Sequence, residues 1–229
     1  MCHDEDMCGR YANFLTEQEL IDAFAIATIA DDARLFPPNW NMGPMQHGLI
    51  IRERPDGREA ELAKWGLVPG WAKDPSVGVR AFNARAETIA EKPTFKNAFA
   101  KRRCIVPANG YFEWQVVDGE KTPQFITPAD GSPLAFAGLT EVWRPSKDDP
   151  WLVTFSIVTT AARGEMQQIH DREPVMLTPD DVEVWLDPES GQDDLFAAID
   201  APAPELTWHA VDKAVGNVRN NGPELIEPA

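Results

Sequence analysis

The sequence lacks any apolar run that approaches the roughly 18 residues needed to cross a bilayer. Its first residues, MCHDEDM, are acidic where a secretory signal would be basic. Cysteine is scarce: Cys2, Cys8 and Cys104 are the only three, too few for a disulfide framework. These absences argue against a membrane-spanning protein and a disulfide-rich secreted one, and they predict a cytoplasmic location.

Positive charge is also scarce, with 21 Lys and Arg against 37 Asp and Glu and a net charge of −16. Taken whole, this balance argues against nucleic acid, because Lys and Arg drive phosphate binding. The segment 61–113 is an exception, since it holds nine cations and five anions; its charge of +4 leaves −20 for the rest of the chain. Two interpretations stay open: an acidic body with one basic binding region, as a salt-rich cytosol would favour, or a chance cluster on an ordinary acidic enzyme.

The hydrophobic pattern predicts many strands and few helices in one globular domain. Thr16 to Glu19 forms a capping box for a helix with Leu20, Ile21, Phe24 and Ala27 on its apolar side. Thr178 begins a second helix, which runs through Leu186. Strands are predicted at 48–54, 61–67, 104–108, 111–117, 123–127, 134–143 and 152–160. Because strands arrive in runs, we predict an α+β fold with a curved, barrel-like, mostly antiparallel sheet and a few flanking helices.

Two extended stretches carry polar residues of interest. In YFEWQVV, residues 111–117, a period of two places Phe112, Trp114 and Val116 on one face, which we expect to be core, and Glu113 on the other. In AFNARAET, residues 81–88, Asn83 and Arg85 share one side. Taken alone, these patterns are better explained by a solvated strand glutamate, a turn asparagine and a surface arginine.

Three further features have less ordinary patterns. His170, in QQIHDREPVML, titrates near neutral pH and could transfer protons, although a structural hydrogen bond to its neighbours explains it equally well. Trp71 follows a Pro-Gly turn and is a candidate stacking platform for a base or sugar. Cys2, His3, Cys8 and His170 lack the spacing of a zinc site, so we expect no metal and no cofactor. Cys104, in CIVPA, is expected to be a buried core thiol.

Together these stretches resemble a known family. The segments CGRY, KWGLVPGWAKD, NARAET, RRCIVPANGYFEW, AFAGLTEVW, IHDREPVML and AVGNVRNNGPELIEP occur in the order and spacing of the SOS response-associated peptidase (SRAP) family, from Cys8 to Pro228. The resemblance implies one α+β domain with a positively charged groove for single-stranded DNA. It also implies an N-terminal cysteine, exposed by removal of the initiator methionine, that attaches covalently to abasic sites.

The chemistry explains why that cysteine must come first. An open abasic site is an aldehyde, and a free α-amine with a pKa near 7.7–8.0 can attack it to give a Schiff base. The neighbouring thiol then closes a durable thiazolidine ring. An internal cysteine has only an amide nitrogen and can make no such ring. The CGRY match selects Cys8, so Met7 is the expected start. Residues 1–7 would be a leader absent from the mature protein, and 8–229 a single domain.

The resemblance assigns roles to individual residues. Asn83 would position the cysteine and the sugar, Glu113 would move protons beside the amine, and His170 would assist opening of the sugar ring and later proton transfers. Phosphate and groove contacts would come from Arg10, Asn41, Pro44, Trp71, Arg85, Thr159 and Arg172. The chain departs from the family pattern at Ala72, where some members have a second tryptophan, and at Glu173, where members often have an apolar or basic residue.

Three functions are compatible with these residues. The leading one is covalent capture of abasic sites in single-stranded DNA during the DNA damage response, by a monomer. The second is an N-terminal-cysteine peptidase, acting on itself or on other proteins. The proton transfers that the resemblance assigns to His170 include β-elimination, a lyase activity, and reversal of the crosslink. The third is a noncatalytic module that binds single-stranded DNA.

Overall fold

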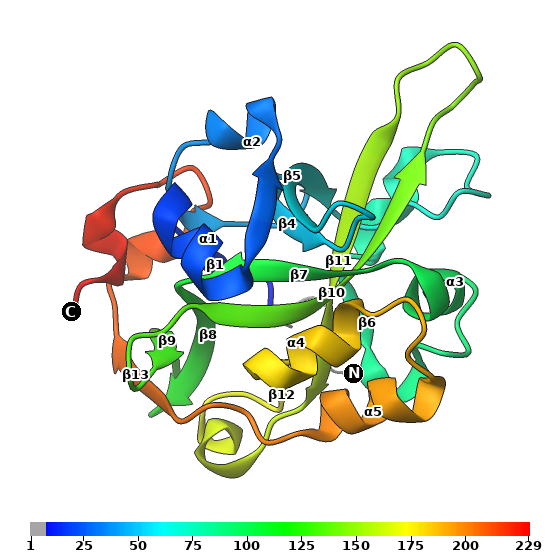
Figure 1. Ribbon diagram of the computed structural model, residues 1–229. Helices are drawn as coiled ribbons and strands as arrows, with labels where there is room; N and C mark the ends of the chain where they lie inside the picture. The colour runs from blue at the N-terminus through cyan, green and yellow to red at the C-terminus, as the bar shows by residue number, and fades with distance from the viewer. Residues whose placement is uncertain (1–7) are drawn as a thin grey trace.

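The computed structural model describes residues 8–229 and consists of two sheets with helices along their edges (Figure 1). The larger sheet has the order β12-β11-β10-β7-β4-β5-β2, and a parallel pairing between β11 and β5 closes five of these strands into a ring. Its strands are β2 (Ile26–Ile29), β4 (His47–Arg52), β5 (Arg58–Trp65), β7 (Arg103–Ala108), β10 (Leu134–Trp143), β11 (Leu152–Ala161) and β12 (Arg172–Pro174). A short strand, β6 (Asn83–Arg85), pairs in parallel with β11.

The smaller sheet is antiparallel throughout, with the order β13-β9-β8-β1-β3. Its strands are β1 (Tyr11–Asn13), β3 (Asn39–Met42), β8 (Gly110–Val117), β9 (Glu120–Pro128) and β13 (Leu206–Ala210). The Asp118-Gly119 turn, with both residues at positive φ, joins β8 to β9 in a long hairpin. The predicted α+β class with a curved, barrel-like, mostly antiparallel sheet is confirmed.

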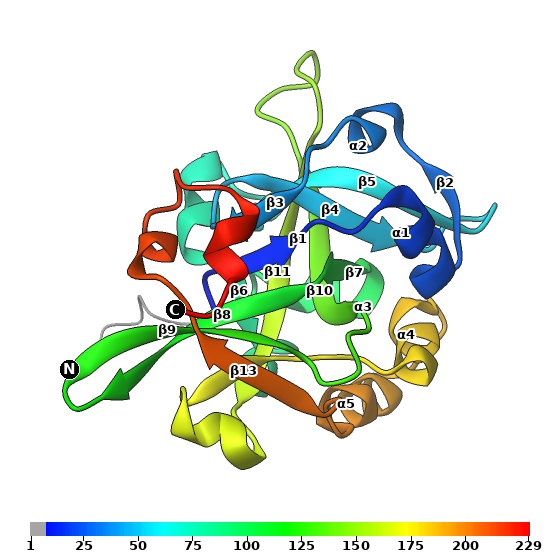
Figure 2. The same ribbon diagram turned by 90° about the vertical axis from the view of Figure 1, so that its left-hand side faces the viewer.

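The helices are short and pack in one hydrophobic cluster against a face of the larger sheet (Figures 1 and 2). They are α1 (Glu17–Phe24), α2 (Asp31–Arg34), α3 (Lys96–Lys101), α4 (Pro179–Leu186) and α5 (Gln192–Asp200), with 3-10 turns at Pro75–Arg80, Ala86–Thr88, Gly164–Gln168, Lys213–Gly216 and Pro223–Ile226. Both predicted helices form behind capping boxes, at Thr16 and Thr178. Ala27 is not on the first helix as predicted, because the left-handed Ala25 ends that helix and the chain continues as β2.

Three strand predictions were too short or were shifted along the chain. The expected strands at 48–54, 61–67 and 123–127 form as His47–Arg52, Arg58–Trp65 and Glu120–Pro128. The turn at Gly57 lies earlier than the polarity pattern indicated, and it moves both strands of that hairpin toward the N-terminus. Strand centres were therefore predictable, whereas strand ends depended on the turns.

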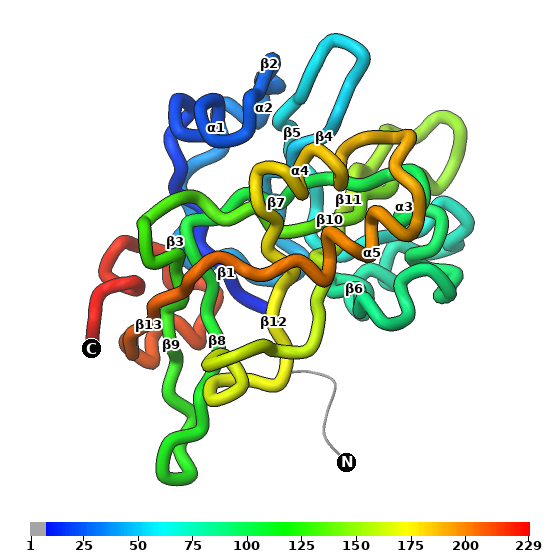
Figure 3. Tube along the Cα trace, turned by 60° about the horizontal axis from the view of Figure 1, so that its bottom comes forward, coloured from blue at the N-terminus to red at the C-terminus, as the bar shows by residue number. Residues whose placement is uncertain are grey.

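Both faces of the first half of β8 are covered. Tyr111 packs into the cluster inside the barrel, and Phe112 packs into a separate cluster beneath the smaller sheet. Glu113, predicted to be solvated, is only 1% exposed. Val116, predicted on the core face, is 64% exposed, because the β8–β9 hairpin extends past the sheet that covers its base (Figure 3). The predicted alternation of side chains along β8 is correct, but the prediction of which face meets solvent is wrong.

Candidate active site at Cys8

Cys8 lies just before β1, where its backbone is held from two sides. Its N–H donates to Glu113 Oε1 on β8 at 2.9 Å, and its carbonyl accepts from Asn83 Nδ2 on β6 at 3.3 Å. Its φ of +34° is unusual for a residue with a side chain, and Gly9 follows it. The two sheets thus meet at Cys8, and the side chains that contact it come from elements distant in sequence.

The carboxyl of Glu113 is buried beneath the cysteine. Burial raises its pKa to about 7, while the nearby His170 and the hydrogen bond from Cys8 oppose that rise. A carboxyl with this pKa can both accept and donate a proton at neutral pH. The neighbouring Cys8 thiol responds in the same direction: burial, and then the Glu113 charge, raise its pKa well above the usual value.

His170 borders the same space from the turn between the 3-10 helix at Gly164–Gln168 and β12. Its side chain is 17% exposed, and its Nδ1 accepts from the Arg172 backbone N–H at 3.1 Å. Asp171 Oδ1 lies 3.2 Å from the same nitrogen but on an exposed side chain. The Arg172 carbonyl lies 3.3 Å from the same nitrogen, so the groups around Nδ1 include a donor and two acceptors. The structural hydrogen bond to neighbouring residues that the sequence predicts is present.

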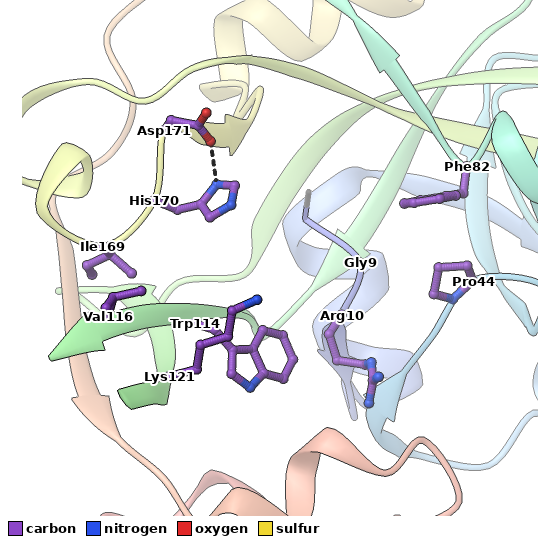
Figure 4. Close-up of a pocket in the computed structure, with 10 residues that line it drawn as sticks. All are labelled: Gly9, Arg10, Pro44, Phe82, Trp114, Val116, Lys121, Ile169, His170 and Asp171. Carbon is purple, nitrogen blue, oxygen red and sulfur yellow. Dashed lines mark ion pairs between the residues drawn. The ribbon is translucent and has the colours of Figure 1, made fainter. Parts of the chain in front are cut away.

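A cleft of about 470 Å³ lies next to Cys8 in the chain, since the following residue, Gly9, lines it (Figure 4). It is lined by Gly9, Arg10, Pro44, Phe82, Trp114, Val116, Lys121, Ile169, His170 and Asp171. Figure 4 shows Gly9 between the His170 side and the side formed by Pro44 and Phe82. Phe82, Trp114 and Lys121 were not predicted as site residues. Trp114 was assigned to the core by alternation, and only the projection of the hairpin brings it to the cleft.

Arg10 and Asn41 form one unit at the edge of the cleft. Arg10 Nη1 donates to Asn41 Oδ1 at 2.9 Å and to the Val215 carbonyl at 2.7 Å, and its guanidinium lies 5.9 Å from the Trp114 ring centre. Asn41, only 1% exposed, donates to the carbonyls of Val215, Asn217 and Asn220. Asn41 therefore fixes the C-terminal segment and orients Arg10, and its own side chain is covered.

Arg172, Thr159 and Arg85 meet along β11 on the other side of Cys8. Arg172 pairs with Glu87 through two hydrogen bonds of 2.5 and 3.0 Å, and it also donates to the Thr159 carbonyl at 2.8 Å. This pairing lowers the pKa of Glu87. Thr159 is buried and stands beside Arg85, which is exposed, in the β6–β11 register. Glu87 was not predicted as a partner, since its contact with Arg172 spans 85 residues.

Glu173, one of the two departures from the family pattern, is a buried charge. It is 1% exposed and accepts from Arg163 Nε at 2.6 Å.

Trp71 is 60% exposed and does not line the cleft beside Cys8. Cys104 is fully buried and free, as expected, and burial raises the pKa of its thiol.

Residues 8–229 contain no three His, Cys, Asp or Glu side chains grouped closely enough to hold a metal ion. Cys2 and His3 lie outside the described residues, as does the predicted leader with Met7. None of the described helices has the length and apolar character to cross a membrane.

Solved structures resemble this fold over nearly its whole length. A protein from Bacteroides thetaiotaomicron superimposes with a TM-score of 0.84 at 23% identity, covering 97% of this chain and 100% of that one. A protein from Bordetella bronchiseptica does so with a TM-score of 0.76 at 27% identity, covering 90% and 100%.

Sequence relatives are closer and carry descriptive names. The abasic site processing protein YoqW of Bacillus subtilis is 38% identical over 96% of this chain and 99% of its own length. The abasic site processing protein YedK of Escherichia coli is 34% identical over 97% and 100%. The profile of the family described as SOS response associated peptidase (SRAP) matches residues 7–218. The chain therefore belongs to the SRAP family.

Proposed function

We propose that this protein captures abasic sites in single-stranded DNA through a thiazolidine formed with Cys8 as its N-terminal residue. The observation that carries the proposal is the 2.9 Å contact between the Cys8 nitrogen and Glu113 Oε1, beside the cleft that Gly9 and His170 line. After removal of the preceding residues, that nitrogen becomes an α-amine beside a carboxyl whose pKa, raised by burial, is about 7. The names of the relatives, abasic site processing proteins, support the same substrate.

The reaction would proceed in two bond-forming steps. The Cys8 amine adds to the C1′ aldehyde, and the resulting carbinolamine loses water to give an imine. The thiol then adds to the imine carbon, so that a C–S bond forms and the thiol proton moves to the nitrogen. The net change joins aldehyde and aminothiol with loss of one water. Glu113 would take a proton from the ammonium and return one to the departing hydroxyl.

The other site residues would hold the strand or open the sugar. His170, which lines the cleft, would help to open the sugar ring. Asn83 fixes the Cys8 carbonyl and so the direction of the amine. Arg10, at the rim of the cleft, and Arg85, on β6, would clamp phosphates on either side of the lesion, and Pro44 and Arg172 would line the groove that holds the strand. Asn41 and Thr159, both buried, would act through Arg10 and Arg172, which they contact.

The test compares two forms of the chain. One begins at Cys8 and the other retains residues 2–7, and each N-terminus is verified by mass. Mixed with an abasic oligonucleotide, the Cys8 form should gain the mass of the strand minus one water. The leader form should be nearly inert, because its Cys8 nitrogen is an amide and because Asp4, Glu5 and Asp6 repel phosphate. Cys8→Ala is the control. An adduct mapped to Cys2 in an unprocessed leader form would contradict the assignment.

A second function is favoured by the family description and by the same contact. The Cys8 nitrogen that Glu113 contacts belongs to the Met7–Cys8 peptide bond, so a cysteine peptidase acting on its own leader would use the same groups. Spontaneous loss of residues 1–7 from purified protein, abolished by Cys8→Ala, would support it. A lyase activity, a monomeric state, a cytoplasmic location and the division into a leader and a single domain stay predictions.

A further inference from the structure

One face of the β8–β9 hairpin forms a wall of the cleft beside Cys8. Trp114 and Val116 on β8 line the cleft, and so does Lys121 on β9. Val116 pairs with Lys121 in the β8–β9 register, and Trp114 lies two residues before Val116. Because side chains alternate along a strand, these three share one face of the hairpin.

Lys121 brings a primary amine to this cleft. It is exposed, and Figure 4 shows its side chain rising from the hairpin with the amine directed into the cleft. Among the described residues that line the cleft, it is the only lysine. Gly9, which follows Cys8, and His170 line the same space. Under the proposed function, a sugar aldehyde held in the cleft therefore has a side-chain amine beside it.

The hairpin is fixed against the turn that carries His170. Gln115 Nε2 donates to the Gln168 carbonyl at 3.1 Å, and Ile169 lines the cleft together with Val116. An imidazole can take up or release a proton near neutral pH. The cleft thus holds a primary amine and an imidazole on two elements that a hydrogen bond joins.

We propose that Lys121 is a second amine nucleophile of the cleft, which forms a transient Schiff base with the C1′ aldehyde of an abasic site and cuts the strand by β-elimination. This inference rests on the proposed function, since it takes the same substrate in the same cleft. It goes beyond that function because the product is a cut strand rather than a lasting crosslink. The activity belongs to the chain in which the Cys8 nitrogen is still an amide.

The reaction begins when the Lys121 amine adds to C1′ and the carbinolamine loses water to give an imine. His170 takes a proton from C2′, which the protonated imine makes acidic. The electron pair forms a double bond between C2′ and C3′, the C3′–O bond breaks, and the phosphate leaves as the 5′ end of the downstream strand. Water then hydrolyses the imine, which restores the lysine and releases an unsaturated aldehyde. One water is lost and one is consumed.

The two amines give different products because only the Cys8 amine has a thiol close enough to close a ring. The imine of a lysine has no such thiol, so it stays open to loss of the C2′ proton and to attack by water. A lasting crosslink therefore requires Cys8, whereas Lys121 leaves no adduct unless its imine is reduced.

The test uses a Cys8→Ala chain in which a neutral Gly-Ser segment replaces residues 2–7, so that residue 8 supplies only an amide nitrogen. The chain is incubated with an abasic oligonucleotide, with and without sodium cyanoborohydride, which reduces an imine to a stable amine. With the reductant, peptide mass mapping should locate the adduct at Lys121. Without it, a denaturing gel should show a cut strand and no adduct.

Matched variants separate the amine from its charge. Lys121→Arg should lose both the trapped adduct and the cleavage, because a guanidinium keeps the positive charge but stays protonated and cannot attack the aldehyde. Lys73→Arg alters an exposed lysine that does not line the cleft, and it should retain both. Thermal unfolding of each variant checks that the fold is kept.

The outcomes separate this inference from the proposed function. If protein beginning at Cys8 forms no crosslink, the proposed function fails. If that protein crosslinks but the Gly-Ser chain neither cuts the strand nor gives a trapped adduct, only the role of Lys121 is overturned. An adduct mapped to another amine would overturn it as well. Cleavage that Lys121→Arg retains would do the same, and would leave Lys121 as a contact for phosphate.

Discussion

Strands β8 and β12 each bury a glutamate near Cys8, and the two sites handle the charge differently. Glu113 and Glu173 are both 1% exposed. Glu173 accepts from the Arg163 guanidinium at 2.6 Å and from the Arg163 backbone N–H at 3.3 Å. Glu113 accepts from the Cys8 N–H, and in the described part of the chain no Lys or Arg forms a salt bridge with it.

The difference shows that burial alone does not define the role of a carboxyl. A buried carboxylate beside a guanidinium has its charge compensated and serves as structure. Without such a cation, burial raises the pKa of Glu113 to about 7, which makes it a proton carrier at neutral pH. The Coulombic effects of both carboxyls reach the Cys8 thiol and raise its pKa, that of Glu113 more than that of Glu173. The presence of a cationic partner, rather than the depth of burial, therefore distinguishes Glu173 from Glu113.

The largest expected effect is on crosslinking rate. In protein beginning at Cys8, Glu113→Gln keeps the size and an acceptor oxygen but removes the titrating proton, so crosslinking should slow about 10²- to 10⁴-fold. His170→Ala should slow it within the same range, while binding to undamaged strands stays intact. The rate is measured by denaturing gel shift on an abasic oligonucleotide. Glu173→Gln is the matched variant and should stay within about tenfold of the parent. Equal losses in the two glutamine variants would remove the distinction.

Stability against pH tests the same contrast in the leader-bearing chain. The pKa of Glu113 in the folded chain, about 7, exceeds its ordinary value of 4.5. The stability that the protonated carboxyl contributes is therefore fully present below pH 4.5 and is lost as pH rises through 7. Glu113→Gln removes that loss. Relative to the parent, the free energy of unfolding of the Glu113→Gln variant should therefore increase by up to about 3 kcal/mol between pH 5 and 8.5. Urea denaturation at both pH values measures it, with the exposed Glu165→Gln as control. A gain that shrinks with rising pH would contradict the burial argument.

The ion pair on β12 should give a smaller effect. Glu173→Gln leaves Arg163 without its counterion, but that side chain is 34% exposed and can reach water. We therefore expect a loss of only about 1–2 kcal/mol in unfolding free energy, between the values for surface and buried pairs. The double variant Arg163→Met with Glu173→Met should recover most of it, since two apolar groups replace the pair. A double variant less stable than Glu173→Gln would mean that the pair itself stabilises the fold.

Much of the fold followed from local patterns, whereas the electrostatics of the site did not. The capping boxes at Thr16 and Thr178 and the long strands at 134–143 and 152–160 carry their signals within a few residues. The burial of Glu113 depends on tertiary contacts, since Cys8, 105 residues earlier, lies against its carboxyl, and no local pattern records this. Before the family resemblance is considered, the pattern therefore favours a solvated glutamate. The Arg163–Glu173 and Arg172–Glu87 pairs are likewise set by tertiary contacts.

The family resemblance identified candidate site residues, but it could not distinguish those with exposed side chains from those that are buried. Asn41 and Thr159 were expected to line a DNA groove, and both are buried beside an arginine that they contact. Arg10 and Arg172 are the groups that these two side chains orient. The sequence treats all four as equal members of one surface, whereas packing divides them into two partly exposed arginines and two buried residues that support them.

The smallest predicted effect concerns the arginines themselves. Arg85, exposed on β6, contacts a phosphate under the proposed function, whereas Arg163 donates to Glu173 and to the Ala201 carbonyl. Arg85→Ala should flatten the dependence of log affinity on log salt for an undamaged single strand by about 0.7, the value of one phosphate contact, while Arg163→Ala should leave the slope unchanged. Fluorescence anisotropy at several salt concentrations measures both slopes in the Cys8→Ala background. A slope that changes with Arg163→Ala and not with Arg85→Ala would place the strand on the β12 side of the cleft, and would make the ion pair of Glu173 part of the binding surface.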